Sequence, residues 1–140
     1  PDTFDFLGFT HCCGKTRKGK FMVLRITSAK RLRGKLLAVK TELRKRMHQP
    51  IAEQGQYLRA VVAGHGRYFA VPCNGARVQA FRFQVGRVWH RTLCRRSQTK
   101  HLSWKRMHKI VAHWLPSPRI CHPYPNQRLI VTTQGKSRVR

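Results

Sequence analysis

The chain has 140 residues, with 30 Lys and Arg against 4 Asp and Glu, and a formal net charge of +26. A hydrophobic share of 41% is enough for a core, which excludes the apolar-poor composition of a disordered basic tail. The length suits one compact domain, and no run reaches the roughly 20 apolar residues of a membrane span or resembles a signal peptide.

So large a charge opposes compaction, and the folded state should therefore need a polyanion. Nucleic-acid phosphates are the first candidate, and an anionic membrane surface is the second. The cysteine count is odd and the spacing irregular, which argues against a secreted disulfide scaffold and favours a reducing cytosol. We expect a cytoplasmic protein of bacterial or organellar type. The cysteines are Cys12, Cys13, Cys73, Cys94 and Cys121.

Two runs rich in strand formers, Thr3–Thr10 and Phe21–Ile26, flank a glycine-bounded basic loop at Gly14–Lys20. This pattern predicts a β-hairpin over residues 1–26. Both faces of each strand are partly apolar, so we expect the hairpin to pack on a partner surface. The chain opens at Pro1 and closes on a basic run, which favours a piece of a longer polypeptide.

Residues 27–116 are expected to form a small basic helical bundle. Thr27 or Ser28 can cap a first helix, and His48-Gln49-Pro50 separates it from a second helix over residues 51–70, which Pro72 ends. The apolar stripes consist of Leu32, Leu36, Val39, Leu43 and Met47 in the first helix and of Leu58, Val61, Val62, Tyr68 and Phe69 in the second.

Asn74-Gly75 predicts a turn before a third helix that ends in Arg95-Arg96, and Ser103 can cap a fourth helix that Pro116 stops. The apolar stripes consist of Val78, Phe81, Val85, Val88 and Trp89, then of Trp104, Met107, Val111 and Trp114. Residues 117–140 should be an extended, Pro-rich basic tail with a strand-like run at 128–133. The fold class is therefore mainly α, with an N-terminal hairpin, a thumb-like bundle and a tail.

Catalysis by acid–base chemistry or by paired metals needs clustered carboxylates, and the sequence offers none. Glu42 should pair with Arg46 one helical turn away. We therefore expect no catalytic residue and no metal site in this chain. The acids are Asp2, Asp5, Glu42 and Glu53.

A zinc site built from His11-Cys12-Cys13 and Cys121-His122 is the alternative to a metal-free chain. Its spacing matches no common ligand pattern, and we favour Cys12 and Cys13 alternating across a strand, one packed and one exposed. The hypothesis of a nucleophilic cysteine has less support than the zinc site, because no residue orients a histidine base.

The basic loop and the basic helix faces are the expected nucleic-acid contacts, because few acids are available to neutralise them. The three tryptophans fall on helical stripes, so we expect core positions for them rather than base-stacking platforms. The predicted RNA-binding residues are Lys15, Arg17, Lys18, Lys20, Lys30, Arg31, Arg33, Lys35, Lys40, Arg44, Arg67, Arg95, Arg96, Lys105 and Arg106.

Several segments, in order, resemble group II intron reverse transcriptases. Phe4-Asp5-Phe6-Leu7-Gly8-Phe9, a basic loop and a Ser-x-Lys-Arg helix start are similar to the end of their palm and the start of their thumb. Residues 64–71 look like the Gly-x-x-x-Tyr-Phe segment of the maturase-specific region, and residues 102–107 and 114–119 look like its later helices and exit. The likeness covers almost the whole chain.

The resemblance implies a thumb and maturase module that grips group II intron RNA and the RNA/DNA template–primer duplex and supports splicing. It implies an RNA-directed DNA polymerase only for a longer parent, because the Tyr-x-Asp-Asp catalytic turn, the fingers and most of the palm have no counterpart here. Mg²⁺ is then expected only in the parent's palm, and no cofactor in this chain. The implied partners are both nucleic acids and the missing fingers and palm, with no membrane.

The alternative is a stand-alone basic structural RNA-binding protein of ribosomal type, which shares the charge but needs no partner domain. A third hypothesis, a complete enzyme, requires primer extension by this chain alone, and we expect none.

Overall fold

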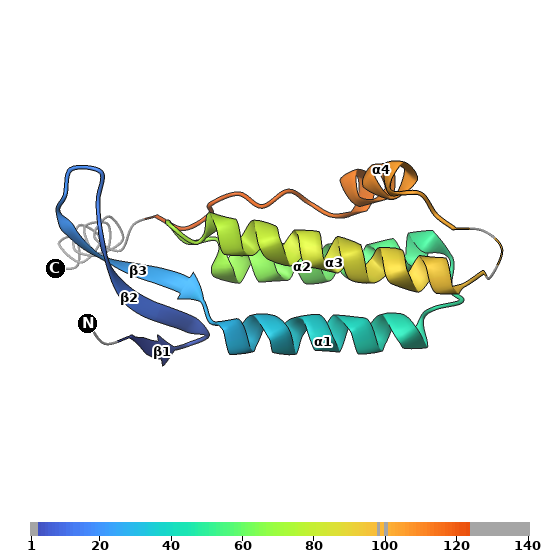
Figure 1. The fold of residues 1–140 in the computed structure, drawn as a ribbon, viewed down its shortest axis with the longest axis horizontal. Coiled ribbons are helices and arrows are strands. Elements are labelled where there is room, and N and C mark those ends of the chain that lie inside the picture. Colours follow the sequence, from blue (N-terminus) through green and yellow to red (C-terminus); the bar gives the residue numbers. More distant parts are fainter. Residues whose placement is uncertain (1–2, 98, 100, 124–140) are drawn as a thin grey trace, which may run out of the picture.

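The computed structural model describes residues 3–97, 99 and 101–123, and it places a three-stranded antiparallel sheet before four helices (Figure 1). The expected order of N-terminal strands followed by helices is thus confirmed. The strands are β1 (Phe4–Phe6), β2 (Phe9–Lys15) and β3 (Phe21–Thr27), and the helices are α1 (Ala29–Lys45), α2 (Ile51–Phe69), α3 (Gly75–Arg95) and α4 (Trp104–Trp114). The strand-like run predicted at 128–133 lies outside the described residues.

The predicted hairpin is present as β2 and β3, but the first strand-forming run is two strands, so the hairpin is part of a three-stranded sheet. Leu7 and Gly8 have φ angles of 52° and 86°, the left-handed pair that a tight two-residue hairpin turn requires. β1 folds back on β2, and the sheet order is β1-β2-β3. The basic loop is shorter than predicted, because Gly14 and Lys15 pair within β2.

Ser28 is the residue that caps α1, with its hydroxyl accepting a hydrogen bond from the Arg31 backbone N–H at 3.3 Å. The backbone N–H of Ser28 also donates a hydrogen bond to the Gly8 carbonyl at 2.9 Å. The turn between β1 and β2 is therefore fixed directly against the start of α1.

Asn74 ties the sheet to the ends of two helices. Its side chain is fully buried, accepts from the Thr27 N–H at 2.9 Å and donates to the Thr27 hydroxyl and the Phe69 carbonyl, each at 2.8 Å. The predicted turn at Asn74-Gly75 is the first step into α3, because Gly75 is already helical. Asn74 therefore fixes where β3 ends relative to α2.

The core lies between the four helices, with α1, α2 and α3 along the long axis and α4 beside α2 and α3 (Figure 1). Most of the predicted stripe residues contribute to it; Met47 lies beyond the end of α1 and is half-buried. The buried core residues are Val39, Leu43, Leu58, Val62, Phe81, Val85, Trp89, Leu93, Met107 and Leu115.

A polar residue sits at the centre of this core. Gln54 is fully buried and accepts from the Trp89 indole N–H at 2.8 Å. Its amide nitrogen donates to the Arg46 carbonyl at 2.7 Å and also reaches the Met47 carbonyl, beyond the end of α1. Gln54 therefore satisfies groups that the α1–α2 connection would otherwise bury unpaired.

Beyond α4 the chain runs back along the bundle without regular structure, as far as the described part extends. The Arg82 guanidinium donates to the Leu115 carbonyl at 3.2 Å, and the backbone N–H groups of Cys121 and His122 donate to the Ala70 carbonyl at the end of α2. The segment from Leu115 to His122 is thus tied to α3 at its start and to the end of α2 at its other end.

Within the described residues, no helix is both long enough and apolar enough to cross a bilayer.

Candidate nucleic-acid interface

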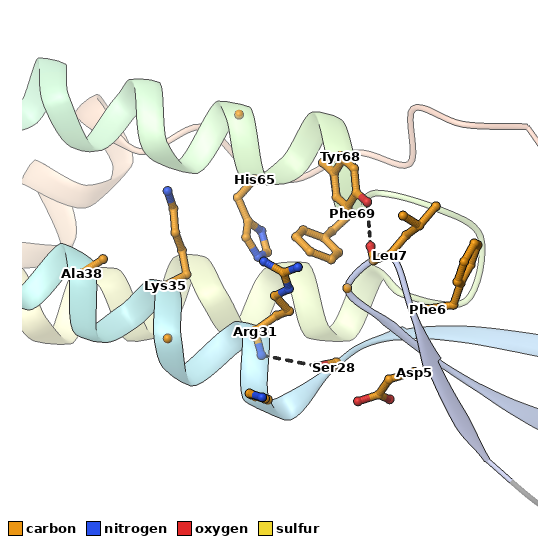
Figure 2. Close-up of a pocket in the computed structure, with 14 residues that line it drawn as sticks. Asp5, Phe6, Leu7, Ser28, Arg31, Lys35, Ala38, His65, Tyr68 and Phe69 are labelled. Carbon is orange, nitrogen blue, oxygen red and sulfur yellow. Dashed lines mark hydrogen bonds between the residues drawn. The ribbon is translucent and has the colours of Figure 1, made fainter.

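A groove opens where the β1–β2 turn, the first turns of α1 and the last turns of α2 meet. Its volume is about 900 Å³. Figure 2 shows the side chains of Arg31 and Lys35 extending from α1 toward α2, with His65 and Tyr68 reaching down from α2. The lining residues are Asp5, Phe6, Leu7, Gly8, Ser28, Lys30, Arg31, Gly34, Lys35, Ala38, Gly64, His65, Tyr68 and Phe69.

Three lining cations, Lys30, Arg31 and Lys35, are exposed and form no ion pair with another residue of the described ranges. The acidic residue at the rim, Asp5, is engaged locally, because its carboxylate accepts from the Thr10 hydroxyl at 2.5 Å. The groove therefore carries an excess of positive charge that an anion can neutralise.

The groove stays open because small residues occupy its walls. A Cβ atom added at Gly34 of α1 or at Gly64 of α2 would meet nothing within 4 Å. Ala38 continues the small surface one helical turn after Gly34. These positions let a ligand approach both helix backbones.

Two distant segments hold the end of the groove together. The Tyr68 hydroxyl donates to the Leu7 carbonyl at 2.6 Å, a bond visible in Figure 2. The Phe9 ring of β2 lies 5.7 Å from that of Tyr68 and 5.0 Å from that of Phe69, measured between ring centroids. The sheet turn is therefore anchored on the last turn of α2.

His65 forms part of the groove wall and is 7% exposed. Its ring stacks on Phe81 with centroids 3.8 Å apart, and Nδ1 makes no hydrogen bond in the described part of the chain. Burial, with a smaller contribution from the charge of Lys35, lowers the pKa of His65 from 6.5 to about 4. The imidazole is therefore neutral at pH 7.

The low pKa of His65 makes folding stability depend on pH. The unfolded chain binds the proton below pH 6.5, whereas the folded chain resists it until about pH 4. Stability is therefore complete above the unfolded pKa and falls by about 3 kcal/mol as pH drops to the folded pKa. Denaturant titrations at pH 7 and pH 4 should show this loss for the wild type and not for His65→Phe, which keeps the ring stack. His101→Gln, at an exposed site, is the control and should lose stability like the wild type.

The open space at Gly34 predicts opposite effects of two substitutions. Gly34→Ala should raise the free energy of unfolding by about 0.5 to 1 kcal/mol, because alanine favours the helix and nothing obstructs its Cβ. Gly34→Leu should fold equally well but fill the groove, and the affinity for a polyanion that binds in the groove should fall about tenfold, or about 1.4 kcal/mol. Gly66 also has open space but does not line the groove, so Gly66→Leu should leave affinity unchanged. A loss of affinity in Gly66→Leu as large as in Gly34→Leu would contradict this assignment.

The predicted RNA-binding residues fall into separate groups on the structure. Lys15, Arg17, Lys18 and Lys20 are exposed at the β2–β3 turn. This turn and the α3–α4 connection lie at opposite ends of the molecule (Figure 1). Of the remaining predicted residues, Arg33, Lys40 and Arg44 are exposed on α1, Arg67 is exposed at the end of α2, and Arg95, Arg96, Lys105 and Arg106 flank the α3–α4 connection.

The cysteine and histidine candidates belong to two segments of the chain, β2 and the segment that follows α4. Cys12 is half-buried and Cys13 exposed on β2, the alternation that the sequence favours. Among the described residues, no three His, Cys, Asp or Glu side chains lie close enough to hold a metal ion. Glu42 pairs with Arg46 at 2.8 Å as predicted, and this hydrogen bond lowers the pKa of Glu42.

One tryptophan contradicts the expectation of core positions for all three. Trp89 is fully buried, and Trp114 packs against Gly55, where an added Cβ would lie 2.4 Å from the indole. Trp104 is 46% exposed because it begins α4 at the edge of the bundle. Its ring stacks on His90 instead of entering the core.

Comparison with models of known protein families, with curated proteins and with solved structures gives no match to this chain.

Proposed function

We propose that this chain is an RNA-binding module, the thumb and maturase portion of a group II intron-encoded reverse transcriptase. It grips intron RNA and the template–primer duplex and so supports splicing and reverse transcription. The observation that carries the proposal is the meeting of two segments at the groove. Leu7 and Phe9 belong to the palm-like motif, Tyr68 and Phe69 belong to the maturase-like motif, and they contact one another.

The charge around this contact supports a nucleic-acid ligand. Lys30, Arg31 and Lys35 line the groove without ion-pair partners in the described ranges, and Gly34 and Gly64 leave room for a backbone to enter. Phosphate contacts of this kind position RNA and supply most of the affinity, with a strong dependence on salt.

The exposed sheet supports a protein partner in addition to RNA. Phe4, Phe6 and Phe21 are 61%, 59% and 70% exposed, and the register places them on one face of the sheet. Large exposed aromatic surfaces are typical of interaction sites. In this proposal the face packs on the fingers and palm of the parent, an arrangement that a free-standing ribosomal-type protein does not need.

Polymerisation belongs to the parent in this proposal, with Mg²⁺ held in its palm. Two acids of the described chain have local partners, Asp5 with Thr10 and Glu42 with Arg46. We expect no metal-dependent primer extension by this chain alone, and extension by a purified sample would contradict that part of the proposal.

Selective RNA binding tests the proposal. The chain is titrated with a folded group II intron RNA and with a random-sequence RNA duplex of matched length at several salt concentrations. Binding to both should weaken with salt, while a preference for the intron RNA should persist, because shape-dependent contacts are less screened than phosphate contacts. Equal affinity for both at every salt concentration would rule out the maturase assignment and leave only general polyanion binding.

A further inference from the structure

Trp104 stands out among the exposed aromatic residues because its ring is held in place. One face of the indole stacks on His90, with centroids 4.0 Å apart and ring planes 28° from parallel. His108, one turn later on α4, approaches at 5.8 Å. With 46% of the side chain exposed, the indole still presents a free surface to solvent.

The His90 ring is held in place by a hydrogen bond to the backbone before α4. Its Nε2 atom lies 2.7 Å from the Leu102 carbonyl, and since a carbonyl can only accept, Nε2 carries the proton. Ser103 then fixes the start of α4 by accepting from the Arg106 N–H. The indole is therefore ordered before any ligand arrives, so binding costs little side-chain entropy.

The two helices that carry Trp104 and His90 are basic. α3 and α4 contain no Asp or Glu, and exposed Arg91 and Lys105 directly follow His90 and Trp104 in the sequence. A flat, exposed aromatic surface on helices that carry cations and no acids matches a nucleobase joined to a phosphate. An apolar protein partner would not require the positive charge of α3 and α4, so the charge favours a nucleic-acid ligand.

We propose that Trp104 is a stacking platform for an unpaired nucleobase of single-stranded RNA, with exposed cations of α3 and α4 contacting the adjoining phosphates. The inference rests on the proposed RNA-binding function and adds a second site to it. α4 lies over the half of the bundle remote from the sheet, whereas the groove lies at the sheet (Figure 1). A duplex keeps its bases stacked internally, so the platform selects unpaired segments.

The test compares a 12-nucleotide oligo(A) with an RNA duplex of the same length, using the full chain. Trp104→Ala should weaken oligo(A) binding about 10- to 100-fold and leave duplex binding and the salt dependence unchanged, because stacking is not ionic. Trp104→Phe should recover most of the affinity. Phe83→Ala is the matched control, since Phe83 is 57% exposed on α3, and it should bind both ligands like the wild type.

Fluorescence gives a second readout that does not depend on the alanine variant folding. Oligo(A) should quench the tryptophan emission of the wild type and leave that of Trp104→Phe nearly unchanged, since Trp89 is fully buried and Trp114 packs against Gly55. Equal oligo(A) affinity of wild type and Trp104→Ala, or equal quenching of wild type and Trp104→Phe, would overturn the inference. Neither result bears on selectivity for intron RNA, so the two proposals fail separately.

Discussion

Replacing Lys30, Arg31 and Lys35 together with glutamine should weaken binding of structured RNA about 100-fold near physiological salt. If each side chain contacts one phosphate, the plot of log affinity against log salt concentration becomes less steep, with the magnitude of its negative slope reduced by roughly 2 to 3. The three side chains are exposed and make no ion pair with the rest of the described chain, so folding should be little affected. Titration across a salt series measures both quantities.

The matched control removes the same charge elsewhere. Lys45, Arg77 and Lys109 are exposed and lie outside the groove, so their triple glutamine variant should lose much less affinity. A third variant with Arg17, Lys18 and Lys20 changed to glutamine measures the contribution of the β2–β3 turn. Equal losses in the groove variant and the Lys45, Arg77 and Lys109 variant would mean that charge alone, and not the groove, determines binding.

Gln54→Leu should lower the free energy of unfolding by about 3 kcal/mol, although the substitution makes the core more apolar. Leucine cannot accept from the buried Trp89 N–H or donate to the Arg46 carbonyl, and each buried group left unpaired costs about 1 to 3 kcal/mol. Denaturant-induced unfolding monitored by circular dichroism gives the value directly.

A double-mutant cycle separates this effect from packing. Trp89→Phe removes the donor, so Gln54→Leu should cost less in that background, and the difference is the coupling between the two side chains. Gln56→Leu, at an exposed site on α2, should change stability by less than about 0.5 kcal/mol. If Gln54→Leu also changes the free energy of unfolding by less than this amount, the hydrogen bonds of Gln54 are not needed for stability.

Helices were predictable because their signals are local. Apolar spacing located α1 to α4, and Ser28 and Ser103 cap α1 and α4 as expected. The turn at Leu7-Gly8 was missed because strand formers surround it and Leu7 rarely adopts a positive φ angle. Gln54 and Asn74 were missed for another reason: their partners Trp89 and Thr27 are distant in sequence, so no local pattern indicates their burial.

The candidate site was predictable in its chemistry and not in its shape. Because the sequence has few acids, many cations were predicted to bind RNA, and Lys30, Arg31 and Lys35 were among them. The sequence did not indicate that these three share a groove. Their proximity to His65 and Tyr68 follows from how α1 packs beside α2, which no single segment specifies. Trp104 fits a helical stripe by spacing, but the first residue of a short helix at the bundle edge remains exposed.

Photo-crosslinking of the full chain to a folded group II intron RNA, followed by mass spectrometry of the adducts, tests the central claim most directly. The groove assignment predicts that the adducts concentrate on the first turns of α1 and the last turns of α2, where Arg31, Tyr68 and Phe69 lie. At a fixed, subsaturating RNA concentration, these adducts should be several-fold weaker in Gly34→Leu. Adducts confined to the β2–β3 turn or spread evenly over all exposed cations would contradict it.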